Sequence, residues 1–592
     1  MNSLYQYHRT RIGIVTITIM FVFTVLSIRL IYIQIIKHDE YSAIAKKNTI
    51  GTRNIHGSRG IIYDRSGTAL TYNLKHHTFW MNTRVHPAID EVCEIFSTVF
   101  NKPKKHYRKL LSRKSNYVVI EKNVVDPLYS ELLTKLKGKN VGSDTVTKRH
   151  YPFGDLAAQV IGYTNTESMG VLGIERQYNS ILSGTSGLKN FSKKANGKLC
   201  SNIYDDDDDS LDNGRDITLT IDIEYQAILQ DELKLAIENS GAQSANGIIL
   251  DPYTGEVLAM ATLPSIDLNN YFDYPIQYHQ NKVISGAYEP GSTFKIVGVS
   301  AGLDENLILP WEKFNCEGGE YHTLNRIFHD HKPHDDLTVS EILMHSSNIG
   351  MVKIADKIGS ERIFRYSVLH GFGEPTGIQL PMENSGILRK FKDWTRSSGP
   401  TIAMGQEIAA TTLQSAMSYC SIANGGYLLK PSIIKSISRN SQNNKIRVEP
   451  QVIRSVMGEE TSKAVLSMLC EVINKGTADK AQMHGFSLAG KTSTAQKFVD
   501  GSYSKIAFMS AFAGIYPSHQ PRLVCLVVVD SPQYGKHWGN ETAAPIVKKV
   551  IERIINLDSN KQDVKMIFAA AQSSNDNIKH FALQTSTVST ED

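Results

Sequence analysis

The feature that most constrains this chain is an apolar segment close to its N-terminus. Residues Ile12–Ile28 contain no charged side chain and are rich in Ile, Val and Phe. A single arginine, Arg29, separates this run from a shorter apolar one, Leu30–Ile36. As a helix, the two runs together are long enough to cross a hydrocarbon layer about 30 Å thick, with the arginine reaching back to the interface. We therefore expect one membrane span, with the rest of the chain on one side of it.

A cleaved signal peptide is the alternative interpretation of this segment. Ala43-Ile44-Ala45 resembles a cleavage site, but it lies far beyond the main apolar run, which is also long for a signal core. An uncleaved anchor therefore fits better. Arg9 and Arg11 favour a cytoplasmic N-terminus, whereas the lysines that follow the segment, beginning with Lys37, oppose it. Charge alone leaves the orientation open.

Length and composition allow several globular domains. The chain has 592 residues and a formal net charge of +5, from 64 Lys and Arg against 59 Asp and Glu. No long basic run exists, so we expect no nucleic-acid partner. The six cysteines are scattered along the chain and indicate neither a zinc module nor a disulfide framework, which leaves the redox compartment open.

The character of the sequence changes near residue 215. Tyr204–Ser210 is a run of aspartates that we interpret as a solvated linker or exposed loop, with calcium binding as the alternative. Ile217–Ile221 then alternates like a strand, and a helical pattern follows through Glu238. Gly247–Leu250 and Val257–Met260 flank a turn-rich connection that suits a hairpin. A large domain that mixes helices and strands is therefore expected from this point.

Ser292 and Lys295 form the first of three motifs that carry chemistry. They follow Tyr288-Glu289-Pro290-Gly291, which suits a turn entering a helix, and a spacing of three places both side chains on one helix face. A serine hydroxyl needs an adjacent base to act as a nucleophile, and a lysine can supply one when burial lowers its pKa. The pattern alone is weak, because serine–lysine pairs with this spacing also begin at Ser186 and Ser432.

Two further polar motifs follow in the chain. Ser346-Ser347-Asn348 comes after a plausible helix over Leu337–Leu343 and suits a proton relay and an amide contact, with a polar loop or helix cap as the alternative. Lys491-Thr492-Ser493-Thr494 suits a strand edge whose lysine binds a carboxylate and whose N–H stabilises an oxyanion. Because side chains alternate along a strand, Ser493 should share a face with Lys491.

In this order the three motifs resemble the signature of penicillin-binding proteins and β-lactamases. The resemblance runs from the membrane segment to about residue 556 and is closest to class B penicillin-binding proteins of the division-specific type. Ile161–Asn165 contains Gly-Tyr-Thr-Asn, which is more similar to division enzymes than to elongation enzymes. Other segments that resemble family motifs, in family order, are Arg59–Gly67, Tyr151–Gly154, Gly170–Glu175, Ala423–Gly426, Gly476–Ala478 and Ala543–Pro545.

The resemblance implies a serine transpeptidase mechanism. Ser292 would attack the penultimate D-alanine carbonyl of a peptidoglycan stem peptide, and Lys295 would take its proton. Ser346 and Lys491 would pass a proton to the departing D-alanine, while Asn348 would position the peptide amide. An amine from a second stem peptide would then resolve the acyl-enzyme and form a crosslink.

The substrate-binding residues implied by the resemblance are Thr492, Ser493 and Thr494. Thr492 and Thr494 would hold the terminal carboxylate, and the N–H groups of Ser292 and Thr494 would form the oxyanion hole. The family usually has glycine where this chain has Ser493. Serine adds a small hydroxyl and needs no special backbone angles, so we expect an active site with an altered β-lactam preference.

The implied fold is of the α+β class. It consists of a penicillin-binding/β-lactamase-like serine transpeptidase domain, with helices around an antiparallel sheet, on an elongated mixed pedestal domain that follows one N-terminal transmembrane helix. We expect no cofactor and no metal. The expected division is a cytoplasmic N-terminus (1–11), a transmembrane anchor (12–36), a dimerisation or pedestal domain (37–215), a transpeptidase domain (216–556) and a loose polar C-terminal tail (557–592).

Gly485–Thr492 also matches the P-loop of nucleotide-binding proteins, and Leu526–Asp530 resembles the acidic strand that often accompanies one. A P-loop should follow a buried strand and open a helix. Thr477–His484 is instead mixed and polar, and Ser493–Lys497 runs quickly into Asp500-Gly501. The context therefore opposes an NTPase.

Other functions remain as alternatives. His329, His331 and His334 lie near Cys316 and His322 and could bind a metal, although the interleaved charges favour an exposed loop. The catalytic domain could instead be a non-enzymatic β-lactam sensor, a degenerate division scaffold or an elongation-type transpeptidase. A β-lactamase would leave the large pedestal unexplained.

The implied chemistry also predicts location and partners. Peptidoglycan is crosslinked outside the inner membrane, so we expect a single-pass protein of a bacterial inner membrane with its catalytic domain in the periplasm. The expected partners are stem peptides, β-lactams, the inner membrane, a membrane glycosyltransferase of the division machinery and other divisome proteins.

Overall fold

The chain is described here by a computed structural model that covers residues 2–84, 88–193, 199–201, 213–324, 326–438, 445–499 and 501–586. It divides into two compact units, Met1–Arg59 with Ser183–Gly214, and Gly60–Leu182 with Arg215–Asp592. The acidic run Tyr204–Ser210 lies outside the described residues, so its interpretation as a linker stays a prediction.

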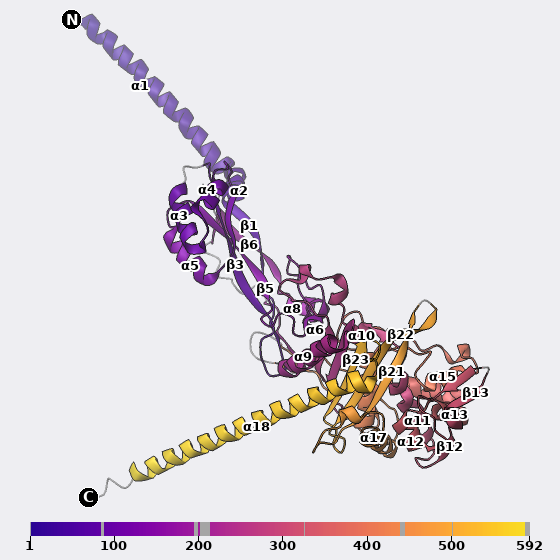
Figure 1. Cartoon of the computed structure of the whole chain (residues 1–592). Coiled ribbons are helices and arrows are strands. Elements are labelled where there is room, and N and C mark those ends of the chain that lie inside the picture. The colour runs from indigo at the N-terminus through magenta and orange to yellow at the C-terminus, as the bar shows by residue number, and fades with distance from the viewer. Residues whose placement is uncertain are drawn as a thin grey trace. The chain divides into compact units, whose positions relative to one another are not determined.

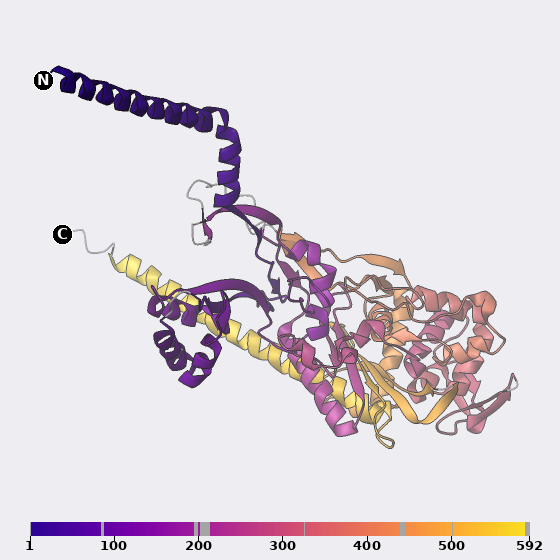
Figure 2. The same ribbon diagram turned by 90° about the horizontal axis from the view of Figure 1, so that it is seen from above.

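The first unit begins with the apolar segment as a helix. Residues His8–Ile36 form a span of 29 residues with a mean hydropathy of 2.4, none of it buried, which is long and apolar enough to cross a membrane. It comprises α1 (Asn2–Ile31) and the π-helical turn η1 (Tyr32–Ile36), and Figure 2 shows the chain changing direction there before α2 (His38–Thr49). The rest of the unit is an antiparallel sheet in the order β1 (Ile50–His56), β6 (Ser186–Lys193) and β7 (Leu199–Ser201).

A small α/β layer opens the second unit and has its own apolar core. In α3, the residues Val92, Cys93 and Phe96 are buried at helical spacing, and they pack with Phe79 from the central strand. The sheet has β3 (Tyr72–Met81) between β4 (Val118–Val125) and β5 (Val141–His150), with α3 (Ile89–Phe100), α4 (Lys104–Leu111) and α5 (Asp126–Lys135) as its helices.

Residues 149–182 are held by a buried ion pair and by close backbone packing. Arg149 donates to Glu175 (2.7 Å), to the Asn73 side chain (2.9 Å) and to the Gly60 carbonyl (2.7 Å). Gly162 has φ +75°, and a Cβ there would lie 1.8 Å from the Leu172 carbonyl oxygen, so only glycine fits. The short helices of this segment are α6 (Ala158–Ile161), α7 (Gly173–Gln177) and α8 (Asn179–Leu182).

The strand, helix and hairpin expected after residue 215 are confirmed. The strand is β8 (Ile217–Leu219), and the helix is α9 (Ile223–Ser240), whose first N–H groups bond to the Asp222 side chain and which ends at Gly241. The hairpin consists of β9 (Ser244–Leu250) and β10 (Val257–Leu263). Both of these strands are buried along their whole length.

The main sheet is antiparallel and has the strand order β10-β9-β23-β22-β21, which places β21 at its edge. Its later strands are β21 (Ala489–Val499), β22 (Ser502–Tyr516) and β23 (Leu523–Asp530), and Figure 1 shows them side by side with α18. Gly247 and Gly514 share a face, and added Cβ atoms there would meet α9 and α18, so these two helices cover that face. The register places Lys491 and Ser493 on the opposite face.

The remaining helices and short strands belong to the same unit. The other helices are α10 (Lys282–Ser285), α11 (Lys295–Asp304), α12 (Val339–His345), α13 (Asn348–Ile358), α14 (Ser360–Leu369), α15 (Ser398–Ala403), α16 (Thr412–Ala423) and α17 (Glu459–Asn474). The shorter strands are β2 (Ile62–Tyr63), β11 (Ala287–Tyr288), β12 (Lys313–Asn315), β13 (Glu320–Thr323), β14 (Arg326–His329), β15 (Asp336–Thr338), β16 (Ala410–Thr411), β17 (Tyr427–Leu429), β18 (Ile434–Ser438), β19 (Lys445–Arg447) and β20 (Val452–Ser455).

The C-terminal segment differs from the prediction. Residues 557–592 were expected to form a loose tail, but α18 (Gly539–Ser586) continues through most of them as a helix. After Pro545 the sequence has neither proline nor glycine up to Ser586, so nothing in it interrupts the backbone hydrogen bonds. A polar composition therefore did not mean an irregular backbone.

We expect Arg149→Ala to lower the thermal unfolding midpoint of the detergent-solubilised chain clearly. The change removes three hydrogen bonds and the cation that faces a buried carboxylate, a loss of about 3–5 kcal/mol. The control is Arg108→Ala, which breaks a pair with Asp90 in which the side chains are 63% and 66% exposed, and should cost less than about 1 kcal/mol. Equal midpoint shifts for the two variants would contradict the structural role of Arg149.

Candidate active site

Ser292 lies in a tight turn that leads directly into a largely buried helix. The turn η5 (Gly291–Phe294) is 3-10 helical and continues into α11, so Ser292 and Lys295 are one turn apart. Residues 295–302 of α11 are all buried, which is typical of a helix surrounded by core. The sequence thus places a half-exposed hydroxyl one turn before a fully buried lysine.

The amine of Lys295 joins the first and second motifs. Its Nζ donates to the Ser346 carbonyl oxygen (2.5 Å), to the Ser346 hydroxyl (3.2 Å) and to the Asn348 side-chain oxygen (2.8 Å). Ser346 caps the end of α12 with φ +59°, an uncommon backbone conformation for a residue other than glycine. The turn therefore presents both a carbonyl and a hydroxyl to the same amine.

Burial changes the protonation of the two lysines. Burial lowers the pKa of Lys295 to about 7, and the negative charge of Asp330 opposes part of that shift. Burial also lowers the pKa of Lys491 far below its ordinary range, and the positive charge of Lys295 lowers it further. A neutral amine is therefore accessible near physiological pH, which is the form that can accept a proton.

Asp330 forms hydrogen bonds to the second motif, and the sequence did not indicate it as a site residue. Its carboxylate accepts hydrogen bonds from the Asn348 N–H (2.5 Å), the Ile349 N–H (3.0 Å) and the Ser347 hydroxyl (2.5 Å), so it caps the start of α13. Its neighbours in the sequence, His329 and His331, are both exposed, although His329 is the last residue of strand β14 and not part of a loop. No local sequence pattern indicates that Asp330, which lies between these two histidines, contacts the second motif.

The third motif lies on edge strand β21, and its side chains alternate as expected. Lys491 and Ser493 share the face opposite α18, which confirms that expectation. Thr492 and Thr494 point the other way: the Thr492 hydroxyl lies 3.3 Å from that of Thr477, and the Thr494 hydroxyl accepts the Gly539 N–H at 2.9 Å. Ser493, placed among the substrate-binding residues from the sequence, is buried and donates its hydroxyl to the Pro290 carbonyl at 2.8 Å.

Two competing sequence patterns take other forms in the structure. Lys491 and Thr492 of the P-loop match lie within strand β21, so this segment is not a loop that opens a helix. The histidines near Cys316 face different neighbours: the ring of His331 lies 4.5 Å from that of Trp538, and the ring of His334 lies 4.7 Å from that of His345. The P-loop interpretation is therefore wrong.

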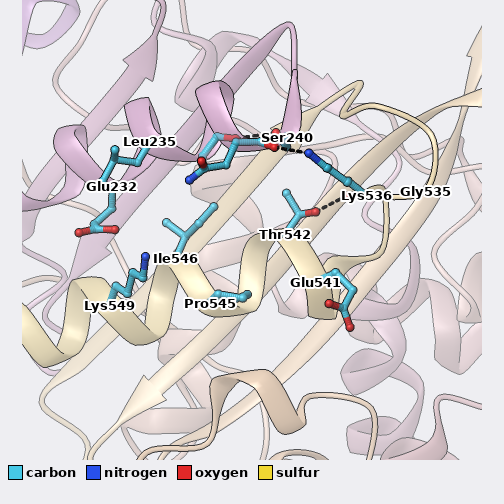
Figure 3. Close-up of a pocket in the computed structure, with 12 residues that line it drawn as sticks. Glu232, Leu235, Ser240, Gly535, Lys536, Glu541, Thr542, Pro545, Ile546 and Lys549 are labelled. Atoms are coloured by element: carbon cyan, nitrogen blue, oxygen red, sulfur yellow. Dashed lines mark hydrogen bonds between the residues drawn. The ribbon is translucent and has the colours of Figure 1, made fainter.

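A cavity of about 360 Å³ lies away from these motifs, between α9 and the start of α18 (Figure 3). Lys536 crosses its edge and donates to the Asn239 carbonyl oxygen at 2.7 Å. The predicted site residues are all described, and none of them lines this cavity. The candidate chemistry therefore concentrates around Ser292, Lys295 and β21.

Comparison with known families agrees with this arrangement. A model of the penicillin-binding protein transpeptidase domain matches residues 246–552, and a model of the penicillin-binding protein dimerisation domain matches residues 54–219. Stage V sporulation protein D of Bacillus subtilis is 30% identical over 551 residues, covering 92% of this chain and 85% of that protein. Peptidoglycan D,D-transpeptidase FtsI of Escherichia coli is 28% identical over 542 residues, covering 89% and 88%.

Solved structures show the same likeness. Penicillin-binding protein 3 of Mycobacterium tuberculosis, complexed with aztreonam, has a TM-score of 0.66 at 25% identity and covers 86% of this chain and 97% of its own. Penicillin-binding protein 2X of Streptococcus thermophilus has a TM-score of 0.75 at 21% identity and covers 86% and 81%. This second likeness concerns the fold alone.

Proposed function

Because this chain belongs to the class B penicillin-binding proteins, we propose that it crosslinks peptidoglycan stem peptides during septal cell-wall synthesis through an acyl-enzyme on Ser292. The observation that carries this proposal is the buried Lys295 amine, which lies one turn after Ser292 and bonds to both Ser346 and Asn348. Such an arrangement gives a serine hydroxyl the neighbouring base that it needs.

Acylation begins at the first motif. Lys295 in its neutral form takes the proton of Ser292, whose oxygen attacks the penultimate D-alanine carbonyl of a stem peptide and forms a tetrahedral intermediate. The N–H groups of Ser292 and Thr494 stabilise the developing oxyanion. These two N–H groups belong to η5 and β21. The Ser493 hydroxyl of β21 donates to the Pro290 carbonyl next to η5. This contact supports the proposal that both N–H groups bond to the same substrate carbonyl.

Departure of D-alanine needs a proton on its amine. The Ser346 hydroxyl is 3.2 Å from Lys295 Nζ and relays a proton together with Lys491, whose positive charge is disfavoured by burial. Asn348 positions the peptide amide, while Thr492 and Thr494 hold the terminal carboxylate. The amine of a second stem peptide then attacks the ester, which forms the crosslink and frees Ser292. A β-lactam acylates the same serine.

The septal role and location belong to the same proposal. The Gly-Tyr-Thr-Asn segment within Ile161–Asn165 and the similarity to FtsI support a division enzyme. The span His8–Ile36 supports a membrane anchor, and the proposed crosslinking outside the inner membrane requires the catalytic domain to be in the periplasm. Partners would be a membrane glycosyltransferase of the division machinery and other divisome proteins. The match of the dimerisation-domain model to residues 54–219 supports a pedestal over 37–215. The match of the transpeptidase-domain model to residues 246–552 supports a transpeptidase domain over 216–556. A cytoplasmic segment (1–11) and an anchor (12–36) would precede these two domains.

A labelled penicillin should acylate the chain at Ser292, and Ser292→Ala should abolish the labelling. Lys295→Ala should lower the acylation rate by at least about 100-fold without unfolding the protein, because a general base is lost. Mass spectrometry of the labelled peptide identifies the adduct, and thermal unfolding checks the fold. An adduct on Ser186 or Ser432, or undiminished acylation of the Lys295 variant, would refute the assignment.

Acylation should speed up as the pH rises through about 7 and level off above it. The reaction uses the neutral amine of Lys295, and burial lowers the pKa of this group to about 7, so protonation below that value removes the base. Asp330→Asn removes a negative charge that raises this pKa, so its midpoint should move to lower pH. The exposed Asp336→Asn serves as the control. Rate constants measured from about pH 5 to about pH 9 decide this, and a flat profile would contradict the base role.

The orientation can be tested with reporter fusions. A periplasm-dependent reporter such as alkaline phosphatase, fused after Asp592, should be active, because the proposed crosslinking takes place outside the inner membrane. The same reporter fused after Arg11, before the uncharged run Ile12–Ile28, should be inactive. A reporter after Asp592 that works only in the cytoplasm would contradict the proposed location.

A further inference from the structure

Ser493, the residue at which the sequence departs from the motif that it resembles, makes a long-range contact. Ser493 is buried, with 2% of its surface exposed. Its hydroxyl donates to the Pro290 carbonyl oxygen at 2.8 Å, across 203 residues of sequence. A glycine there would have no side chain with which to make this bond.

The turn that accepts this hydrogen bond contains a glycine, so its own backbone does not fix its conformation firmly. Gly291, which directly precedes Ser292, has φ +55°, and glycine has the widest backbone freedom of any residue. The Pro290 carbonyl accepts a second bond from the Thr293 hydroxyl at 2.7 Å, but that donor belongs to the same turn. The Ser493 hydroxyl ties the turn to a different element, the main sheet.

The turn before Ser292 and strand β21 are closely packed at this contact. A Cβ added to Gly291 would lie 2.5 Å from the Ser493 oxygen and 3.3 Å from the Ala495 side chain, so turn and strand already touch. On its other side the turn is held by a bond from the Gly291 N–H to the Gly405 carbonyl at 3.0 Å. Residues 290–291 are therefore clamped between Gly405 and β21.

From these contacts we infer that Ser493 is a positioning residue, whose hydroxyl fixes the turn bearing Ser292 against strand β21. Ser493 directly precedes Thr494, and Pro290 lies two residues before Ser292. The bond therefore spans the two segments that carry the N–H donors proposed for the oxyanion, and it holds those donors at a constant separation. This inference rests on the proposed function of Ser292.

The hydroxyl of Ser493 can be removed without leaving a buried group unpaired. Without the Ser493 hydroxyl, the Pro290 carbonyl keeps its bond from Thr293, so no buried acceptor is left unpaired. The substitution therefore affects how firmly the turn is held and does not create a fold defect. Its effect should appear in the acylation step, since a fixed oxyanion site acts on the transition state more than on bound substrate.

The test uses the full-length chain in detergent and a fluorescent penicillin. Saturation of the rate with penicillin concentration separates the non-covalent dissociation constant from the acylation rate constant. Ser493→Ala and Ser493→Gly should each lower the rate constant about tenfold, which corresponds to about 1.4 kcal/mol, and change the dissociation constant less than about twofold. Agreement between the two variants would assign the effect to the hydroxyl, because alanine keeps the Cβ.

The matched control is Ser462→Ala. Ser462 is also 2% exposed and donates its hydroxyl to a backbone carbonyl of another element, Ile422, at 2.6 Å. Its loss should lower the unfolding midpoint about as much as Ser493→Ala does but leave the acylation rate constant unchanged. A slower rate in both variants would reduce the Ser493 effect to a general loss of stability and overturn the inference.

The remaining outcomes separate this inference from the proposed function. Labelled native protein with an unchanged rate in Ser493→Ala, or a faster rate in Ser493→Gly, would overturn the positioning role alone. Native protein that is never acylated would overturn the proposed function and the inference with it. If glycine then restored acylation, the native chain would be a scaffold with a blocked site.

Discussion

Burying the charged ammonium group of Lys295 is unfavourable in free energy, and the contacts around it offset part of that cost. Water is excluded because the first turns of α11 are enclosed by core on all sides. Three oxygen acceptors from Ser346 and Asn348 replace the lost water, and the lowered pKa allows the amine to become neutral. The same burial therefore leaves an amine that can be neutral near physiological pH, one turn after Ser292.

Holding those acceptors in place requires support from a second layer of contacts. Ser346 adopts a positive φ, which is maintained only when its neighbours leave no alternative. Asp330 supplies that constraint by bonding to the N–H groups of Asn348 and Ile349 and to the Ser347 hydroxyl. Its negative charge also raises the pKa of Lys295, so one carboxylate affects both the geometry of the turn and the protonation of this amine.

The edge position of β21 explains how one strand serves several roles. Only one of its sides pairs with β22, and alternation sends Lys491 and Ser493 to one face and Thr492 and Thr494 to the other. The first face packs against the turn that carries Ser292, while Thr494 bonds to the first residue of α18. Both faces of the strand are thereby held by contacts with neighbouring elements.

The sequence by itself determined the class of chemistry and much of the local structure. The membrane span, the helix that follows residue 222, the β9–β10 hairpin and the alternation along Lys491–Thr494 all depend on neighbouring residues, so local patterns were enough. The resemblance of three ordered motifs identified the family. The polar composition of residues 557–586 misled, because helix formation there depends on the absence of breakers and not on apolar content. Only the tertiary structure decided that Asp330 lies beneath the second motif and that Ser493 bonds to Pro290. These contacts join residues 18 and 203 positions apart, and such pairings arise from how the elements pack, for which a linear pattern holds no signal.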